Sequence, residues 1–125
     1  LWSNWLDEFR KLVPFTGLWL DMNEPENFCS GVCSKYDLPD HPIMSKLPYI
    51  PTGRNLESKI LPLDAYHADS KNTVHETHSV YSTLEVKATH DYFKSKNERA
   101  MVVSRSGFSG IGKYGFRHLG DNFST

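Results

Sequence analysis

A short apolar run that ends in acid, Gly17–Leu20 followed by Asp21, constrains this chain more than any other feature. Four apolar residues between turn signals are typical of a buried strand in a parallel sheet. In α/β proteins the functional site lies at the carboxyl ends of such strands, which is where Asp21 and Glu24 stand. Aspartate also favours turns after strands, so the pattern alone leaves a catalytic and a structural interpretation equally open.

The length and charge of the chain limit its class. It has 125 residues, enough for one small domain, and a net charge of −1. This charge favours neither nucleic acid nor an anionic membrane as a partner, and no apolar run is long enough to span a bilayer. Residues 1–4 contain neither an initiator Met nor the start of a signal peptide, so we expect an internal piece of a longer chain.

The first part of the chain predicts a helix, a strand and a long excursion. Residues 3–13 have apolar side chains at helical spacing, with Ser3 as a candidate N-cap and Pro14 as the stop. Residues 22–72 contain repeated prolines and no persistent period. A loop longer than about 15 residues is usually functional or disordered, and the many apolar residues here argue against disorder. We therefore expect an ordered excursion over a site.

The second part predicts another helix and another strand. Thr73 and Glu76 match a capping box, and the helix is expected to run to about Lys96 with Asn97 as its C-cap. Residues 100–105 predict a second buried strand that again ends in a charge. The succession of helix, strand, excursion, helix and strand is typical of an α/β fold with a parallel sheet. The helical stripe expected to face the core has members four residues apart: Val80, Leu84, Ala88 and Tyr92.

Three motifs that are typical of other functions are incomplete in this chain. Residues 110–115 fit G-x-G-x-x-G, but they do not follow the strand directly and no helical pattern comes after them. His75 and His78 lack the spacing of a zinc-binding helix, and residues 21–32 lack the Gly and Glu of a calcium loop. We therefore expect neither a metal nor another cofactor.

Cys29 and Cys33 fit a local disulfide or two free thiols, and both alternatives stay open.

Two aspartates, Asp21 and Asp121, are candidates for paired-carboxylate chemistry, although the residues alone do not single them out among 15 acids. Residues 19–28, Trp-Leu-Asp-Met-Asn-Glu-Pro-x-Asn-Phe, resemble the nucleophile signature of glycoside hydrolase family 31, the α-glucosidase family. Residues 104–114 resemble its Arg-Ser-x-Phe-x-Gly-x-Gly segment, and residues 120–122 resemble its Gly-Asp-Asn acid/base segment. With weaker likeness elsewhere, the resemblance covers nearly the whole chain.

The resemblance implies both a fold and an activity. Residues 1–125 would form a partial (β/α)8 TIM barrel, an α/β fold, with two to three strands and a long βα-loop at about 22–72. The protein would be a retaining α-glucosidase that removes terminal α-linked glucose from oligosaccharides through a covalent glycosyl-enzyme intermediate. A lysosomal or secreted location is implied, and the oligomeric state is open. Open sheet edges predict that the isolated piece is inactive.

The same resemblance implies roles for individual residues. Asp21 would be the nucleophile, Asp121 the general acid and then the general base, and Glu24 a support for the nucleophile. The side chains implied to line the sugar pocket are Trp19, Met22, Arg105, Phe108 and His118.

His118 marks a departure from the family pattern. Relatives usually carry His-Trp ahead of the Gly-Asp pair with one residue between, and this chain has Arg117-His118 there. The change is compatible with altered specificity, a weakened enzyme or a sequence error. It keeps two alternatives open, a non-catalytic homologue that binds carbohydrate or a protein partner and a transglycosylase on the same scaffold.

Overall fold

The computed structural model describes residues 1–29, 49, 56, 59–68 and 71–120 of the chain. It divides the chain into two compact units. One unit contains Leu1–Glu24 and Ser79–Thr125, and the other contains Pro25–His78.

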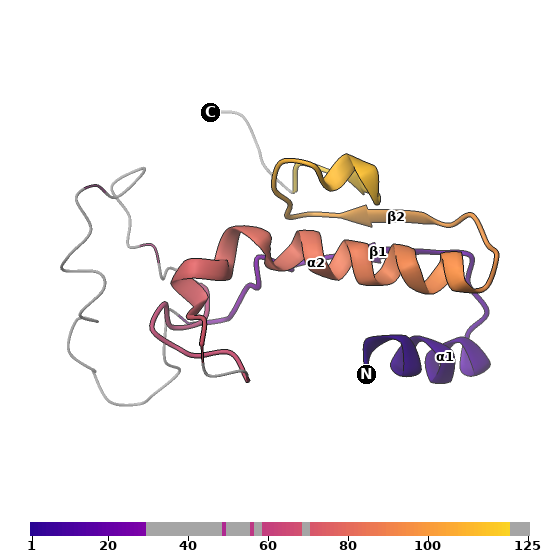
Figure 1. Ribbon diagram of the computed structural model, residues 1–125, viewed down its shortest axis with the longest axis horizontal. Helices are drawn as coiled ribbons and strands as arrows, with labels where there is room; N and C mark the ends of the chain where they lie inside the picture. The colour runs from indigo at the N-terminus through magenta and orange to yellow at the C-terminus, as the bar shows by residue number, and fades with distance from the viewer. Residues whose placement is uncertain (30–48, 50–55, 57–58, 69–70, 121–125) are drawn as a thin grey trace. The chain divides into compact units, whose positions relative to one another are not determined.

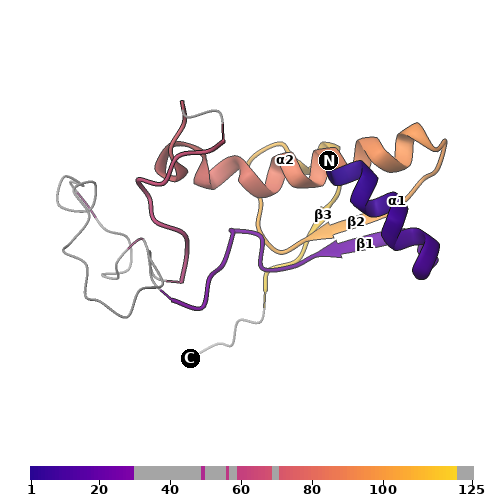
Figure 2. The same ribbon diagram turned by 90° about the horizontal axis from the view of Figure 1, so that it is seen from below.

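The first unit is built on a three-stranded parallel sheet, which Figures 1 and 2 show from two sides. The strands lie side by side in the order β1 (Gly17–Leu20), β2 (Met101–Ser104) and β3 (Phe116–Arg117). The first two are in register, with Gly17 opposite Met101 and Leu20 opposite Ser104. The parallel sheet and the two predicted strands are therefore confirmed, and β3 is an additional strand that the sequence did not predict.

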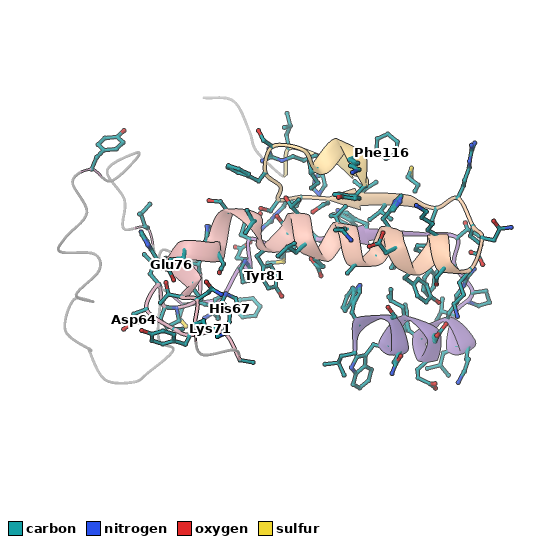
Figure 3. The ribbon with its side chains drawn as sticks, viewed as in Figure 1. Asp64, His67, Lys71, Glu76, Tyr81 and Phe116 are labelled. Atoms are coloured by element: carbon teal, nitrogen blue, oxygen red, sulfur yellow. The ribbon has the colours of Figure 1, made fainter. Side chains whose placement is uncertain are left out.

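Among the residues that the structure describes, only one face of this sheet is buried. Leu20, Val102 and Ser104 point to the same face and are buried. The opposite face carries Trp19, Met101 and Phe116, each more than 60% exposed, and Phe116 is labelled in Figure 3. The prediction of buried strands is therefore right for one face of the described sheet and wrong for the other.

Helix α1 (Trp2–Leu12) packs into the same unit, and Leu6 is its buried residue. Its N-cap is Leu1, and no side chain caps it, so the prediction of Ser3 as N-cap is wrong. Ser3 lies one residue inside the helix, where its own backbone is already helical. The helix ends before Pro14 as expected, with the Val13 N–H donating to the Phe9 carbonyl at 2.9 Å.

Helix α2 (Val74–Ser95) begins and ends with the predicted signals. The Thr73 backbone N–H donates to Glu76 Oε2 at 2.8 Å, and the Glu76 N–H donates to Thr73 Oγ1 at 3.4 Å, which confirms the capping box. At the other end Asn97 adopts a left-handed φ of 59°. The N–H of the next residue, Glu98, donates to the Phe93 carbonyl at 3.0 Å, which completes a Schellman motif.

The buried face of α2 differs from the predicted stripe. Leu84 is 60% exposed, whereas Tyr92 is buried as expected. The fully buried side chains of α2 are Ser82, Val86, Thr89 and Phe93. Two of these are small and polar, and the Thr89 hydroxyl donates to the Glu85 carbonyl one turn back at 2.9 Å. The same hydroxyl accepts from Trp2 Nε1 at 2.9 Å, so the buried Thr89 joins α2 to α1 through a polar contact.

The described residues of the second unit include a small buried cluster of Ile60, Leu63 and Val74. Figure 3 shows His67 and Glu76 near the start of α2 in this unit.

Cys29 is disulfide-bonded, which favours a local disulfide over two free thiols, and Cys33 lies outside the described residues. Most of the predicted excursion at 22–72 also lies outside them, so its role stays a prediction. None of the helices traced in the described ranges has the length and apolar character needed to cross a membrane.

Candidate active site

The carboxyl ends of all three strands carry predicted site residues. Asp21 follows β1, Arg105 follows β2 and His118 follows β3. The backbone ladder continues past the strand ends, because the Arg105 N–H donates to the Leu20 carbonyl at 3.1 Å and the His118 N–H donates to the Ser104 carbonyl at 3.0 Å. Parallel strands therefore deliver these three residues to one edge of the sheet.

Arg105 and Glu24 form the strongest contact at this edge. Arg105 Nε donates to Glu24 Oε1 at 3.0 Å, and Nη2 donates to Oε2 at 2.9 Å. This two-pronged geometry matches the planar guanidinium to the carboxylate and fixes the orientation of both groups. Both side chains are less than one third exposed. Glu24 therefore acts on the rest of the site by holding Arg105.

Asp21 lies between two basic side chains. Its Oδ1 is 3.7 Å from Arg105 Nε and 3.9 Å from His118 Nε2. Both distances are longer than a hydrogen bond. These contacts are therefore electrostatic, and no hydrogen bond to either side chain fixes the orientation of the carboxylate. An aspartate in this position has a charged partner at its side and oxygens that a reacting group can approach.

His118 also contacts the exposed ring of Trp19. The two rings meet edge to face with centroids 5.5 Å apart, and Trp19 Nε1 donates to His118 Nε2 at 2.8 Å. The backbone N–H of Gly120 faces the other ring nitrogen, Nδ1, at 3.1 Å. A neutral imidazole accepts at only one nitrogen. Two tautomers are therefore compatible with these contacts. In one, Nδ1 carries the proton and Nε2 accepts from the Trp19 indole. In the other, Nδ1 accepts from the Gly120 N–H and Nε2 carries a proton on the side of Asp21.

A buried amide, Asn23, lies beneath this group and was not predicted from the sequence. Asn23 is 5% exposed. Its Nδ2 donates to Glu85 Oε2 and to Ser104 Oγ, both at 2.8 Å, and its Oδ1 accepts from the Ser106 N–H at 3.1 Å. The preceding residue, Met22, has a left-handed φ of 52°, which is uncommon outside glycine and turns the chain sharply after β1. The turn directs Asn23 into the interior.

Not every predicted site residue belongs to this group. The described structure brings together five of them: Trp19, Asp21, Glu24, Arg105 and His118. Met22 and Phe108 are exposed, and in the described ranges no polar or ring contact joins them to the group. The Phe108 backbone N–H instead donates to Thr83 Oγ1 of α2 at 3.1 Å. Asp121 lies outside the described residues, so its place in the site stays a prediction.

Several known proteins are similar to this chain in sequence. It is 35% identical over 127 residues to the lysosomal alpha-glucosidase of Bos taurus, a match that covers 99% of this chain and 13% of that protein. It is 30% identical over 125 residues to the intestinal sucrase-isomaltase of Homo sapiens, covering 95% of this chain and 7% of that protein. It is also 30% identical over 152 residues to alpha-xylosidase 1 of Arabidopsis thaliana, covering 99% of this chain and 16% of that protein. The chain thus spans a small part of each relative's length.

A family model described as the glycosyl hydrolases family 31 TIM-barrel domain matches residues 1–125. This confirms the resemblance predicted from the motifs, and it agrees with a parallel sheet whose strand ends carry the acids and the arginine. Because the match covers the whole chain, the chain belongs to the TIM-barrel domain of glycosyl hydrolase family 31.

Proposed function

We propose that the protein containing this chain is a retaining α-glucosidase, with Asp21 as nucleophile and Asp121 as acid/base. The observation that supports this most directly is the position of Asp21 at the end of β1, 3.7 Å from an arginine that Glu24 holds in place. A carboxylate that attacks an anomeric carbon must keep its charge and its open oxygens. The described contacts of Asp21 are compatible with both requirements.

The proposed reaction has two steps. In the first, an Asp21 oxygen bonds to the anomeric carbon while Asp121 gives its proton to the leaving oxygen, and the glycosidic bond breaks. In the second, water attacks the same carbon, Asp121 takes the proton of that water, and the ester to Asp21 breaks. Two inversions at one carbon retain the configuration. Arg105 stays beside Asp21 and Glu24 throughout, as their positive neighbour.

The sugar pocket is proposed at the carboxyl edge of the sheet, beside Asp21. Trp19 is 62% exposed, and its flat ring suits the apolar face of a glucose unit. Met22, Phe108 and His118 would complete the lining. Relatives are named for glucosidase, sucrase-isomaltase and xylosidase activities, so the preference for glucose is the finer part of the proposal.

A lysosomal or secreted location is also proposed. One relative is named a lysosomal enzyme, and Cys29 is disulfide-bonded, as is usual in oxidising compartments. Other relatives are named as an intestinal protein and a plant protein, so the names do not point to a single compartment.

The second candidate function is a homologue that binds sugar without hydrolysing it. His118 favours it, because this residue engages the indole N–H of Trp19 and stands 3.9 Å from the proposed nucleophile. A side chain in that place competes with a substrate hydroxyl for both groups. A transglycosylase would share the first step and pass the glucose to an acceptor sugar in place of water.

The test compares the full-length protein with its Asp21→Asn variant on maltose, an aryl α-glucoside and an aryl α-xyloside. We expect turnover by the wild type and a loss of roughly 10³-fold or more in kcat for the variant, since loss of a nucleophile leaves only binding and the other groups. Proton NMR of the first product should show the α-anomer. Asp91→Asn is the matched control, because it makes the same change in an exposed ion pair of α2.

Each other result has a definite meaning. Equal turnover by wild type and Asp21→Asn removes Asp21 from the mechanism, and a β-anomer as first product removes retention. Absence of turnover on all three substrates, with binding of glucose retained, supports the binding homologue. Added acceptor sugars that appear in the products support the transglycosylase.

A further inference from the structure

The network around Asn23 does no chemistry in the proposed reaction, yet it connects α2 to both strand ends. Glu85 stands on α2 and is partly buried, and Asn23 and Ser104 are buried. Asn23 uses both amide hydrogens, one toward Glu85 Oε2 and one toward Ser104 Oγ. Its oxygen accepts from the Ser106 backbone. Every polar atom of the Asn23 side chain therefore has a partner.

Only one orientation of the Asn23 amide satisfies these partners. Rotating it by half a turn would place its oxygen against the Glu85 carboxyl group and its NH2 group against the Ser106 N–H. The Ser106 amide can only donate, so both new contacts would be unfavourable. The Ser104 hydroxyl has one proton, and its nearer acceptor is the Ser106 carbonyl at 2.7 Å, with Asn23 Oδ1 at 3.2 Å. Ser104 is therefore free to accept from Asn23.

The network fixes the two segments that carry the site. Asn23 lies between Asp21 and Glu24 in the turn after β1, and Ser104 and Ser106 flank Arg105 after β2. Bonds from one amide to both serines hold the turn after β1 against the turn after β2. The two hydrogen bonds from Arg105 to Glu24 join the same two turns.

We propose that Glu85 is a positioning residue for Asp21 and Arg105, which it holds in place by accepting a hydrogen bond from Asn23. For its effect on turnover, this inference rests on the proposed function. The structural part stands on the buried contacts alone. Glu85 itself touches neither Asp21 nor Arg105 in the described contacts, so its influence passes through Asn23 and the serines.

The surroundings of Glu85 agree with a role as acceptor. Burial raises the pKa of Glu85, and the bond from Asn23 opposes that rise by favouring the charged form. A partly buried carboxyl group is costly unless it is hydrogen-bonded, and Asn23 supplies the bond. A carboxyl group that has taken up a proton still has an oxygen that can accept. The proposed role of Glu85 therefore depends on the length of its side chain, which brings an accepting oxygen to Asn23, and not on its charge.

The experiment separates the effect of side-chain length from the effect of charge at Glu85 in the full-length protein. Glu85→Gln keeps the length and one accepting oxygen and loses the charge. Glu85→Asp keeps the charge and shortens the side chain by one CH2 group, which withdraws the acceptor from Asn23. Asp91→Asn on the same helix is the control, since its exposed ion pair with Lys87 lies outside the network.

Two readouts are taken on these variants. The first is hydrogen exchange of the peptide that contains Ser106, whose N–H is held by Asn23. We expect exchange about tenfold faster in Glu85→Asp and a change within about twofold in Glu85→Gln and the control. The second is turnover of an aryl α-glucoside. We expect kcat to fall by about 10- to 100-fold in Glu85→Asp with a much smaller change in KM, and to be largely kept in Glu85→Gln.

The results that overturn the inference are distinct from those that overturn the proposed function. Unchanged exchange and kcat in Glu85→Asp overturn the inference, and so does damage by Glu85→Gln that equals or exceeds that by Glu85→Asp. A wild-type protein without turnover overturns the proposed function, and exchange at Ser106 then still decides the structural part. Faster exchange in every peptide of Glu85→Asp would show a general structural role and would also overturn it.

Discussion

At the scale of single residues, the sequence identified the charged groups better than their partners. Asp21 and Arg105 were expected near the ends of neighbouring strands, and they lie 3.7 Å apart. Glu24 was expected to support Asp21, and its described contact is with Arg105, the charged neighbour of Asp21. Asn23 and Glu85 were missed, because the 62-residue separation between them leaves no local pattern. A single buried amide gives no periodic signal, so its contacts became visible only in three dimensions.

The contact between Trp19 and His118 leads to a prediction at this scale. Changing His118 to Trp removes an acceptor from Trp19 and a basic group from the side of Asp21. We expect kcat/KM on an aryl α-glucoside to rise about tenfold if the wild type is a weakened enzyme, equivalent to about 1.4 kcal/mol. The same change in a pure binding homologue should leave turnover undetectable.

The matched variant is His118→Asn, which keeps a polar side chain without a basic ring. We expect it to stay close to the wild type in KM while losing the ring contact with Trp19. A rise in activity as large as that of His118→Trp would show that the loss of the imidazole, and not the gain of an indole, is responsible.

At the scale of elements, local signals predicted helix and strand positions to within a residue or two. The strand at Gly17–Leu20 and the capping box at Thr73 are where the sequence places them. The buried face of α2 was harder to predict, since Ser82 and Thr89 lie on it and a search for apolar spacing passes over them. Strand β3 has two residues, too few to produce a period.

The start of α2 gives a prediction with a definite dependence on pH. Hydrogen bonds from the Thr73 backbone and side chain lower the pKa of Glu76 in the folded protein. A lowered pKa means that Glu76 stabilises this helix start above its unfolded pKa. That contribution is lost as the pH falls through the folded pKa. We expect Glu76→Gln to speed hydrogen exchange in the first turn of α2 near neutral pH.

The difference between Glu76→Gln and wild type should shrink as the solution is acidified, because the wild-type carboxylate then takes up a proton. Exchange rates are corrected for their intrinsic pH dependence, and the C-terminal turns of α2 serve as the internal control. A difference that grows on acidification would contradict the assigned role of the charge.

At the scale of the whole molecule, the sequence predicted the family and, from the open sheet edges of a partial barrel, a piece that is incomplete by itself. The motif blocks indicated the family that the family model matches over residues 1–125. Their spacing said nothing of how much apolar surface the chain would leave open. The described structure exposes Trp5, Phe9 and Leu12 on α1, and Trp19 and Met101 on the sheet. Such surface in one small unit is more than a soluble monomer usually presents.

The isolated 125-residue chain is therefore expected neither to unfold cooperatively nor to hydrolyse an α-glucoside. It should bind a hydrophobic dye and show a broad thermal transition by circular dichroism, because Trp19, Met101 and Phe116 are exposed on one face of the described sheet. The full-length protein under the same conditions is the control. A sharp two-state transition together with turnover would show that the chain needs no further cover.

The backbone bonds that carry the ladder one residue beyond the strands also bear on how such a site evolves. The amide of His118 is tied to the Ser104 carbonyl and that of Arg105 to the Leu20 carbonyl, whatever side chains these positions carry. A mutation at either position therefore exchanges a functional group while the main chain around it keeps its course. Single codon changes at these two positions can in this way bring a new functional group to the site without moving the main chain.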